Sequence, residues 1–200
     1  MSGQRARGDP PPLTFHPATP DRWAHLEALF GERGACAGCW CMYWRLDAGT
    51  YTAGKGPGNR AALRRIVRRG GEPGILVYAG EEPIGWCAVA PREEYPRLDR
   101  SRVLARLDEK PVWSISCLFV ARPWRKRGVS RALIEAAVAH ARSRGARIVE
   151  GYPVDPAGPQ ADAFVWTGIA SAYARAGFRE AERRSPTRPI MRRHVSPRKP

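Results

Sequence analysis

The sequence predicts a domain of the α/β (α+β) class, in which strands and helices alternate around one core. Two observations support this prediction. Hydrophobic residues make up 43% of the 200 residues and charged residues 26%, which is typical of a folded chain with the length of one domain. Apolar segments with strand-like patterning are separated by segments in which apolar residues recur at helical spacing.

The two ends of the chain are expected to lie outside this domain. Residues 1–12 contain Gly, Pro and Arg but no core residues, so they predict a disordered tail, and residues 195–200 predict a basic tail. A single domain is expected over residues 13–194. No run of 18 apolar residues and no apolar stretch behind the basic N-terminus occur, so we expect a cytoplasmic protein without a membrane partner.

The first part of the chain predicts a short strand followed by two helices. Residues 13–17 are the strand candidate. The next apolar residues recur at helical spacing: Trp23, Leu26, Leu29 and Phe30. Thr19 or Asp21 is the expected cap of this helix, which Gly31 ends, and Asn59 is the expected cap of a second helix that runs to about Arg69.

Three strands are expected in the middle of the chain. Residues 75–79 and 84–90 predict two strands joined by a hairpin turn at 80–83. A short helix is expected near residues 101–107. Residues 112–120 are apolar and β-branched, which indicates a central strand.

The last part of the chain predicts a parallel crossover. A helix with a broad apolar face is expected to end near Arg144, and residues 146–152 form the next strand, so strand, helix and strand make one right-handed unit. A short helix at 168–175 and a closing pair of strands at 178–183 and 188–193 follow.

The chain is strongly basic, with 34 Lys and Arg against 19 Asp and Glu, which gives a net charge of +15. A polyanionic partner is therefore plausible: nucleic acid, anionic lipid or a phosphorylated cofactor. The basic residues are spread along the chain instead of forming one block. Nucleic acid is for this reason the less favoured partner, and a basic nucleic-acid-binding protein remains an alternative function.

The segment with the clearest chemistry joins the central strand to the long helix. A helix N-terminus presents unpaired N–H groups and a partial positive charge. Gly128 lets the backbone approach a ligand closely, and Arg125, Lys126 and Arg127 add cations. These features suit a pyrophosphate cradle, and equally a solvated basic turn before an ordinary helix.

Two motifs in this part of the sequence resemble the GCN5-related N-acetyltransferase (GNAT) superfamily. The first is Arg125-Lys-Arg-Gly128-Val-Ser130, which follows a strand, and the second is Tyr173-Ala-Arg-Ala-Gly177-Phe178. The resemblance covers about nine-tenths of the chain. It implies a mixed, mostly antiparallel sheet that splays open at a cofactor cleft and carries helices on both faces.

The same resemblance implies that acetyl-CoA is the co-substrate. Backbone groups of Leu118, Phe119 and Val120 would pair with the pantetheine arm. The pyrophosphate would be held by the turn that follows: Arg125, Lys126, Arg127, Gly128, Val129 and Ser130.

The implied reaction is direct attack of a primary amine, from a small molecule or a peptide, on the thioester in a ternary complex. Tyr173 stands where the family places the acid that protonates the leaving thiolate, and simple packing of this side chain is the alternative. Ser114 stands where some relatives carry a carboxylate base. Deprotonation of the amine is therefore expected through water held by Ser114 or Ser116, or through a carboxylate such as Glu150.

Further departures from the family pattern concern the cofactor. Ser130 stands where Gly or Ala is commoner, and Trp166 stands where many relatives have Asn. Because the usual base is absent and packing is an alternative role for the candidate acid Tyr173, a non-catalytic CoA-binding sensor is an alternative to the enzyme. Domains of this kind often pair, so a homodimer is also considered.

The segment Cys36-Ala-Gly-Cys39-Trp-Cys41 invites a metal interpretation. A fourth zinc ligand would have to be His25 or Cys87, and no second Cys-x-x-Cys pair exists. The five cysteines are odd in number, and reduced thiols without a metal are therefore expected.

The aromatic residues of this segment are candidates for the acceptor pocket. The run Cys39-Trp-Cys-Met-Tyr-Trp-Arg45 resembles a subset of uncharacterised bacterial acetyltransferases, in which the region after the first helix forms a wall of the acceptor site. The predicted acceptor-binding residues are Trp40, Tyr43, Trp44 and Trp86. Packing of these side chains against the core is the alternative.

Overall fold

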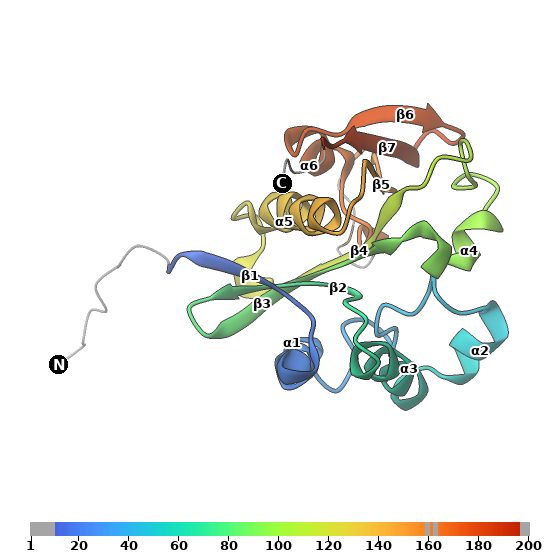
Figure 1. Ribbon diagram of the computed structural model, residues 1–200. Coiled ribbons are helices and arrows are strands. Elements are labelled where there is room, and N and C mark those ends of the chain that lie inside the picture. The colour runs from blue at the N-terminus through green and yellow to red at the C-terminus, as the bar shows by residue number, and fades with distance from the viewer. Residues whose placement is uncertain (1–10, 159–160, 162–163, 197–200) are drawn as a thin grey trace.

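The computed structural model describes residues 11–158, 161 and 164–196, and in this part of the chain seven strands form one sheet in the order β1-β2-β3-β4-β5-β7-β6 (Figure 1). The strands are β1 (Leu13–Pro17), β2 (Gly74–Ala79), β3 (Glu82–Pro91), β4 (Trp113–Val120), β5 (Ile148–Gly151), β6 (Arg179–Arg183) and β7 (Pro189–His194). The helices are α1 (Trp23–Phe30), α2 (Ala48–Ala53), α3 (Pro57–Arg68), α4 (Pro96–Asp99), α5 (Val129–Ser143) and α6 (Ala170–Arg175).

All neighbouring strands are antiparallel except β4 and β5, which are parallel and are joined by α5. The predicted crossover unit and the mixed, mostly antiparallel sheet are thus confirmed. A parallel pair needs a long connection between its strands, and the fifteen residues of α5 supply it.

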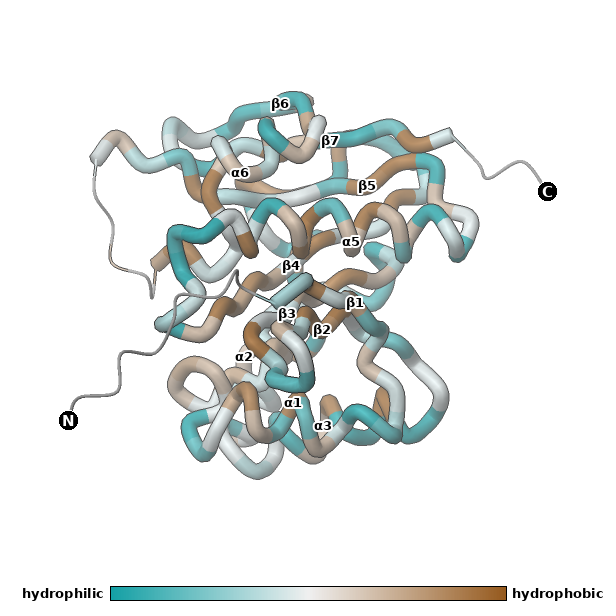
Figure 2. Tube along the Cα trace, turned by 90° about the vertical axis from the view of Figure 1, so that its left-hand side faces the viewer, coloured by the Kyte–Doolittle hydropathy of each residue, from teal (hydrophilic) through white to brown (hydrophobic). Residues whose placement is uncertain are grey.

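Helices cover both faces of the sheet, with α5 and α6 on one side and α1 and α3 on the other (Figure 1). Side chains of β2 alternate between these layers, so that Val77 packs toward α5 while Leu76 packs with Leu26 and Leu63. Every residue of β2 is buried. The continuous apolar run of this strand reflects burial on both faces, and Figure 2 shows hydrophobic strands between the helical layers.

The sheet opens between β4 and β5. Their pairing begins at Trp113 and Val149 and ends at Ile115 and Gly151, whereas β4 continues to Val120 beside β3 alone. The ring of Tyr173 lies at the point where the two strands separate. A Cβ added to Gly151 would fall 2.0 Å from Cε1 of that ring, so only glycine leaves room for it.

A β-bulge in β4 lies next to this opening. Cys117 pairs with Ala88 and Ile115 pairs with Val89, which leaves Ser116 as the extra residue. Beyond the bulge, Leu118 and Val120 pack in the layer of α5, whereas Cys117 and Phe119 pack on the side of α1 and α3.

Two sequence predictions about helix starts are wrong. Asn59 does not cap α3, because the helix already begins at Pro57, whose fixed φ suits a first helical position. Asn59 is instead buried and donates from Nδ2 to the carbonyls of Gly38 and Tyr51, 3.1 and 3.3 Å away. Neither Thr19 nor Asp21 caps α1, because a 3-10 turn at Pro20–Arg22 leads directly into it.

The helix expected near residues 101–107 does not form either. The helical turn lies earlier, in α4, and the Leu104 amide donates to Ser101 Oγ at 3.2 Å while the Leu104 carbonyl accepts from Arg92. These contacts satisfy the backbone groups that a helix would otherwise pair. The sequence analysis also missed α2, in which Asp47 caps the helix through Thr50 N.

The ends of the chain are described only in part. Of the predicted tails at residues 1–12 and 195–200, residues 1–10 and 197–200 lie outside the described residues. Val195 continues past β7 and donates to the Arg147 carbonyl at 2.9 Å. Within the described segments, no helix combines the length and the apolar character needed to cross a bilayer.

We predict that Gly151→Ala lowers the free energy of unfolding by about 2 kcal/mol, because the new methyl group would overpack against the Tyr173 ring. Urea denaturation of both proteins measures the difference. Gly158→Ala is the matched control, since no atom lies within 4 Å of a Cβ added there. Equal stability of the two variants would contradict the tight contact at the strand opening.

Candidate active site

A cleft of about 680 Å³ lies beside the part of β4 that no longer pairs with β5. Its walls come from the second half of β4, the turn before α5, and residues 165–175. Eight of the nine predicted cofactor residues line it: Leu118, Phe119, Val120, Arg125, Lys126, Gly128, Val129 and Ser130. The ninth, Arg127, is exposed, with its guanidinium 5.5 Å from the centre of the Trp124 ring at the cleft.

The N-terminus of α5 provides the anion-binding end of this cleft. Gly128 precedes the helix with φ +81°, and no atom of the described residues lies within 4 Å of a Cβ added to it. Within the same part of the chain, no side chain caps the first turn of α5. The first amides of the helix and the positive end of its dipole are thus available to a phosphate group in the cleft.

The open edge of β4 already makes two contacts within the chain. The Leu118 amide donates to the Trp166 carbonyl at 2.7 Å, and the Val120 carbonyl accepts from Arg125 Nε at 2.9 Å. Backbone groups alternate along a strand, so the Val120 amide faces the same side as the Leu118 amide. Arg125 therefore ties the basic turn to the strand, and the pairing of this edge with pantetheine stays a prediction.

Tyr173 is fully buried beside the cleft and does not line it. Its hydroxyl donates to the Thr167 carbonyl at 3.1 Å, and its ring meets Phe178 edge to face at 5.1 Å. The preceding residue, Ala172, does line the cleft. Burial raises the pKa of Tyr173 well above the usual value for tyrosine, so the side chain remains a neutral proton donor.

Two of the predicted acceptor residues lie in the core. Trp40 stacks on Trp23 at 6.1 Å, and Trp86, which is fully buried, meets Phe30 edge to face at 5.9 Å. Both belong to the layer beneath α1 and α3. Their bulk fills the space between the helices and the sheet, and neither ring has a face open to an acceptor.

The other two predicted acceptor residues lie next to the cleft. Tyr43 and Trp44 contact Trp166, with ring centres 5.4 and 5.9 Å apart, and Trp166 lines the cleft. The guanidinium of Arg97 lies 3.9 Å from the centre of the Tyr43 ring. The sequence analysis missed Arg97, because it comes from α4, more than fifty residues away along the chain.

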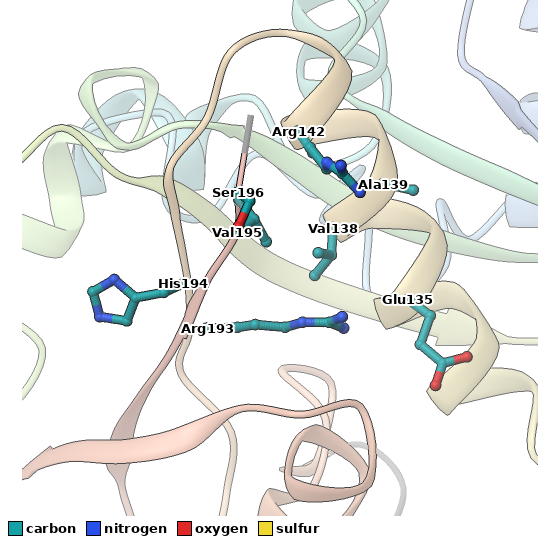
Figure 3. Close-up of a pocket in the computed structure, with 8 residues that line it drawn as sticks. All are labelled: Glu135, Val138, Ala139, Arg142, Arg193, His194, Val195 and Ser196. Atoms are coloured by element: carbon teal, nitrogen blue, oxygen red, sulfur yellow. The ribbon is translucent and has the colours of Figure 1, made fainter. Parts of the chain in front are cut away.

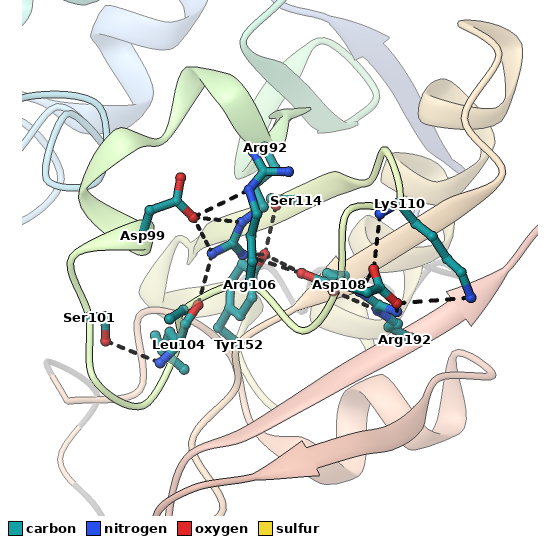
Figure 4. A network of polar contacts seen from close by, with 12 residues as sticks. Arg92, Asp99, Ser101, Leu104, Arg106, Asp108, Lys110, Ser114, Tyr152 and Arg192 are labelled. Atoms are coloured by element: carbon teal, nitrogen blue, oxygen red, sulfur yellow. Dashed lines mark hydrogen bonds and ion pairs between the residues drawn. The ribbon is translucent and has the colours of Figure 1, made fainter.

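Of the candidate bases, Ser114 and Glu150 belong to a buried polar network (Figure 4). Tyr152 donates to Glu150 at 2.7 Å and lies 2.7 Å from Ser114 Oγ. Glu150 also contacts Arg92 at 3.3 Å and Arg192 at 2.6 Å. Two guanidinium groups and a phenol therefore surround this carboxylate, so its oxygens are already engaged by contacts within the protein.

Ser116, the third candidate, differs from these two. It is 1% exposed, and its Oγ has no hydrogen-bond partner among the described residues. Its place in the bulge brings it next to the strand opening. Ser116 does not line the cleft, and its side chain also interacts with the Tyr95 hydroxyl, so its role in holding a water molecule stays a prediction.

The cysteines do not gather into a metal site. Cys41 and Cys117 are buried with their sulfur atoms 3.1 Å apart, and Cys36 lines the cleft. Contact with Cys117, followed by burial, raises the pKa of Cys41, and burial raises the pKa of Cys39 to about 11. Among the residues that the structure describes, no three His, Cys, Asp or Glu side chains are grouped as metal ligands.

A second groove of about 530 Å³ lies between α5 and the end of β7 (Figure 3). Glu135, Arg142 and Arg193 reach into it. It contains none of the predicted catalytic, cofactor or acceptor residues. The predicted cofactor residues lie instead at the cleft beside β4.

Comparison with known families agrees with this geometry. Residues 40–165 match the model of the acetyltransferase (GNAT) family, and this segment contains β4, the basic turn and most of the cleft. The chain belongs to the GNAT family. It is thus an acyltransferase that uses a coenzyme A thioester, as the motifs around Gly128 and Tyr173 suggested.

Solved structures show the same fold. A GNAT-family acetyltransferase from Listeria monocytogenes superposes with a TM-score of 0.56 and 10% sequence identity, over 92% of this chain and 95% of that one. The PaiA N-acetyltransferase from Thermoplasma acidophilum, in complex with coenzyme A, superposes with a TM-score of 0.53 and 11% identity, over 92% and 99%. No curated protein matches the sequence significantly.

We predict that the double substitution Lys126→Gln with Arg127→Gln raises the Kd for coenzyme A about 5- to 10-fold at low salt, because two exposed cations next to the α5 N-terminus are lost. The difference should shrink as salt screens these charges. Isothermal titration calorimetry measures both effects. The double variant Arg100→Gln with Arg102→Gln removes two exposed charges elsewhere and should bind normally; an equal loss in both double variants would contradict a local role.

Proposed function

We propose that this GNAT protein transfers the acetyl group of acetyl-CoA to a primary amine of a small molecule or peptide, by direct attack in a ternary complex. The observation that carries the proposal is the cleft at the open edge of β4, which ends at the N-terminus of α5. One end of the cleft suits an anion, and the other adjoins a buried phenol.

The described residues fit coenzyme A. The open helix end at Gly128, with Lys126 beside it, suits a diphosphate, and the apolar side chains of Leu118 and Val120 suit a flexible arm of low charge. Bound acetyl-CoA would supply the thioester carbonyl that the amine attacks. The proposal needs no metal for this step.

Residues of this chain are proposed to carry out the proton transfers of the reaction. The attacking amine must be neutral, so its proton leaves before or during attack, and water held by Ser116 Oγ is the proposed acceptor. The new N–C bond forms as the C–S bond breaks, and the sulfur then needs a proton. Tyr173 is the proposed donor, because burial keeps its phenol neutral, its ring packs against Gly168, and it directly follows Ala172; both of these neighbours line the cleft.

We predict that Tyr173→Phe lowers kcat about 100-fold while leaving the Kd for coenzyme A unchanged, because the variant keeps the ring and loses the proton donor. Release of free thiol from acetyl-CoA across a panel of amines measures the rate, and calorimetry measures binding. In the wild-type protein, ionisation of Tyr173 should not reduce kcat below about pH 10, since its pKa is raised.

Tyr78→Phe is the control, because it removes a hydroxyl that bonds His25 Nδ1 at 2.9 Å, away from the cleft. It should leave kcat unchanged. A Tyr173→Phe enzyme that retains at least a third of the wild-type kcat would rule out this acid.

A further inference from the structure

Tyr43, Trp44 and Trp166 form an aromatic cluster beside the cleft. Several buried arginines near this aromatic cluster are paired with carboxylates. The guanidinium of Arg45 contacts Glu94, that of Arg92 contacts Asp99 and Glu150, and that of Arg192 contacts Asp108 and Glu150. This follows the general rule that a charge withdrawn from water needs an opposite charge and hydrogen bonds.

Arg188, which directly precedes β7, departs from this rule. It is partly buried, and within the described residues its guanidinium has one hydrogen bond, from Nη1 to Thr167 Oγ1 at 3.3 Å, and no carboxylate within 4 Å. Burial lowers the pKa of Arg188, which shows that the charge is poorly compensated. A guanidinium has five donors, so most of those of Arg188 have no partner among the described residues and are accessible to water or to a ligand.

The position of Arg188 connects it to the proposed reaction centre. Thr167, its hydrogen-bond partner, is fully buried, and the carbonyl of the same residue accepts from the Tyr173 hydroxyl. Trp166, the preceding residue, lines the cleft and contacts Tyr43. Arg188 itself does not line the cofactor cleft, so the phosphates of coenzyme A are not its evident partner.

The aromatic cluster near Arg188 is also positively charged. Arg97 covers one face of the Tyr43 ring at 3.9 Å and donates to the Tyr43 carbonyl at 3.3 Å. A cation from the protein thus already occupies the place where a cationic ligand would stack. Such surroundings repel a polyamine and attract an anion.

We propose that the acceptor is an amine that also carries an anionic group, carboxylate or phosphate, and that Arg188 binds this group through its free donors. The inference rests on the proposed function, since it names the acceptor class for that reaction. The planar guanidinium matches either anion with two parallel hydrogen bonds, while Tyr43 and Trp166 contact the apolar part of the acceptor. Arg188 is thus a specificity residue, not an acid or a base.

The kinetic test compares matched amines that differ only in charge: α-amino acids, their carboxamides, and phosphate monoesters of the corresponding amino alcohols. In the wild-type protein the charged members should have the higher kcat/KM. Arg188→Gln should lower kcat/KM for the charged members about 30-fold or more, mainly through KM, and change the carboxamides less than about 3-fold. A difference in kcat/KM between the carboxylate series and the phosphate series identifies which of the two anions the site binds.

Two further variants make the test specific. Arg184→Gln removes the same charge from the same loop, but Arg184 bonds the carbonyls of Ala105 and Arg106, so it should leave the preference unchanged. Arg188→Lys keeps the positive charge but loses the planar guanidinium with its paired donors. Its affinity for the charged acceptors should therefore lie between those of Arg188→Gln and the wild-type protein. Equal kcat/KM for acids and amides in the wild-type protein would overturn the proposal while leaving acetyl transfer intact.

A binding measurement separates the two proposals. Calorimetry with the CoA-loaded protein and N-acetylated amino acids, compared with N-acetylated amino amides, needs no turnover. Tighter binding of the acids that Arg188→Gln abolishes supports the anion site, even if no amine releases thiol and the proposed reaction fails. Acids and amides that bind equally would overturn the anion site whatever the turnover.

Discussion

The loss of pairing between β4 and β5 is the constraint on which the site depends. Before the opening, β4 and β5 are held by their backbone ladder, and the Arg92–Glu150 contact joins the turn after β3 to β5. At the opening, Gly151 has no side chain and the Tyr173 ring takes the space. Beyond it, one edge of β4 turns toward the cleft instead of a neighbouring strand, and every candidate cofactor residue lies on that edge or directly after it.

Arginine performs different tasks according to its surroundings. Arg92 and Arg192 meet around Glu150, where opposite charges compensate one another and brace the sheet. Lys126 and Arg127 stay in water, where their attraction to an anion is long-range and sensitive to salt. Arg188 lies between these extremes, withdrawn from water without a matching carboxylate, which is why it points to a ligand.

The sequence predicted best what depends on local patterns. Strand and helix periodicity located β2, β3, β4 and α5, and the motif at Gly128 located the cleft, because backbone geometry and helix polarity are set within a few residues. Prediction from the sequence failed where contacts between residues far apart along the chain determine the position of a side chain. Asn59 is buried because it donates to the carbonyls of Gly38 and Tyr51, and Trp86 packs against Phe30. The spacing of residues along the chain does not reveal these contacts.

The extra residue in β4 has a consequence for how such an enzyme can change. Without the bulge at Ser116, β4 would alternate regularly along its whole length, and Leu118 would share a face with Ser114 instead of Ile115. With it, Ile115, Leu118 and Val120 all pack in the layer of α5, whereas Cys117 and Phe119 pack on the side of α1 and α3. A substitution on one side of this strand can therefore change the packing there and leave the side chains of the other layer in place.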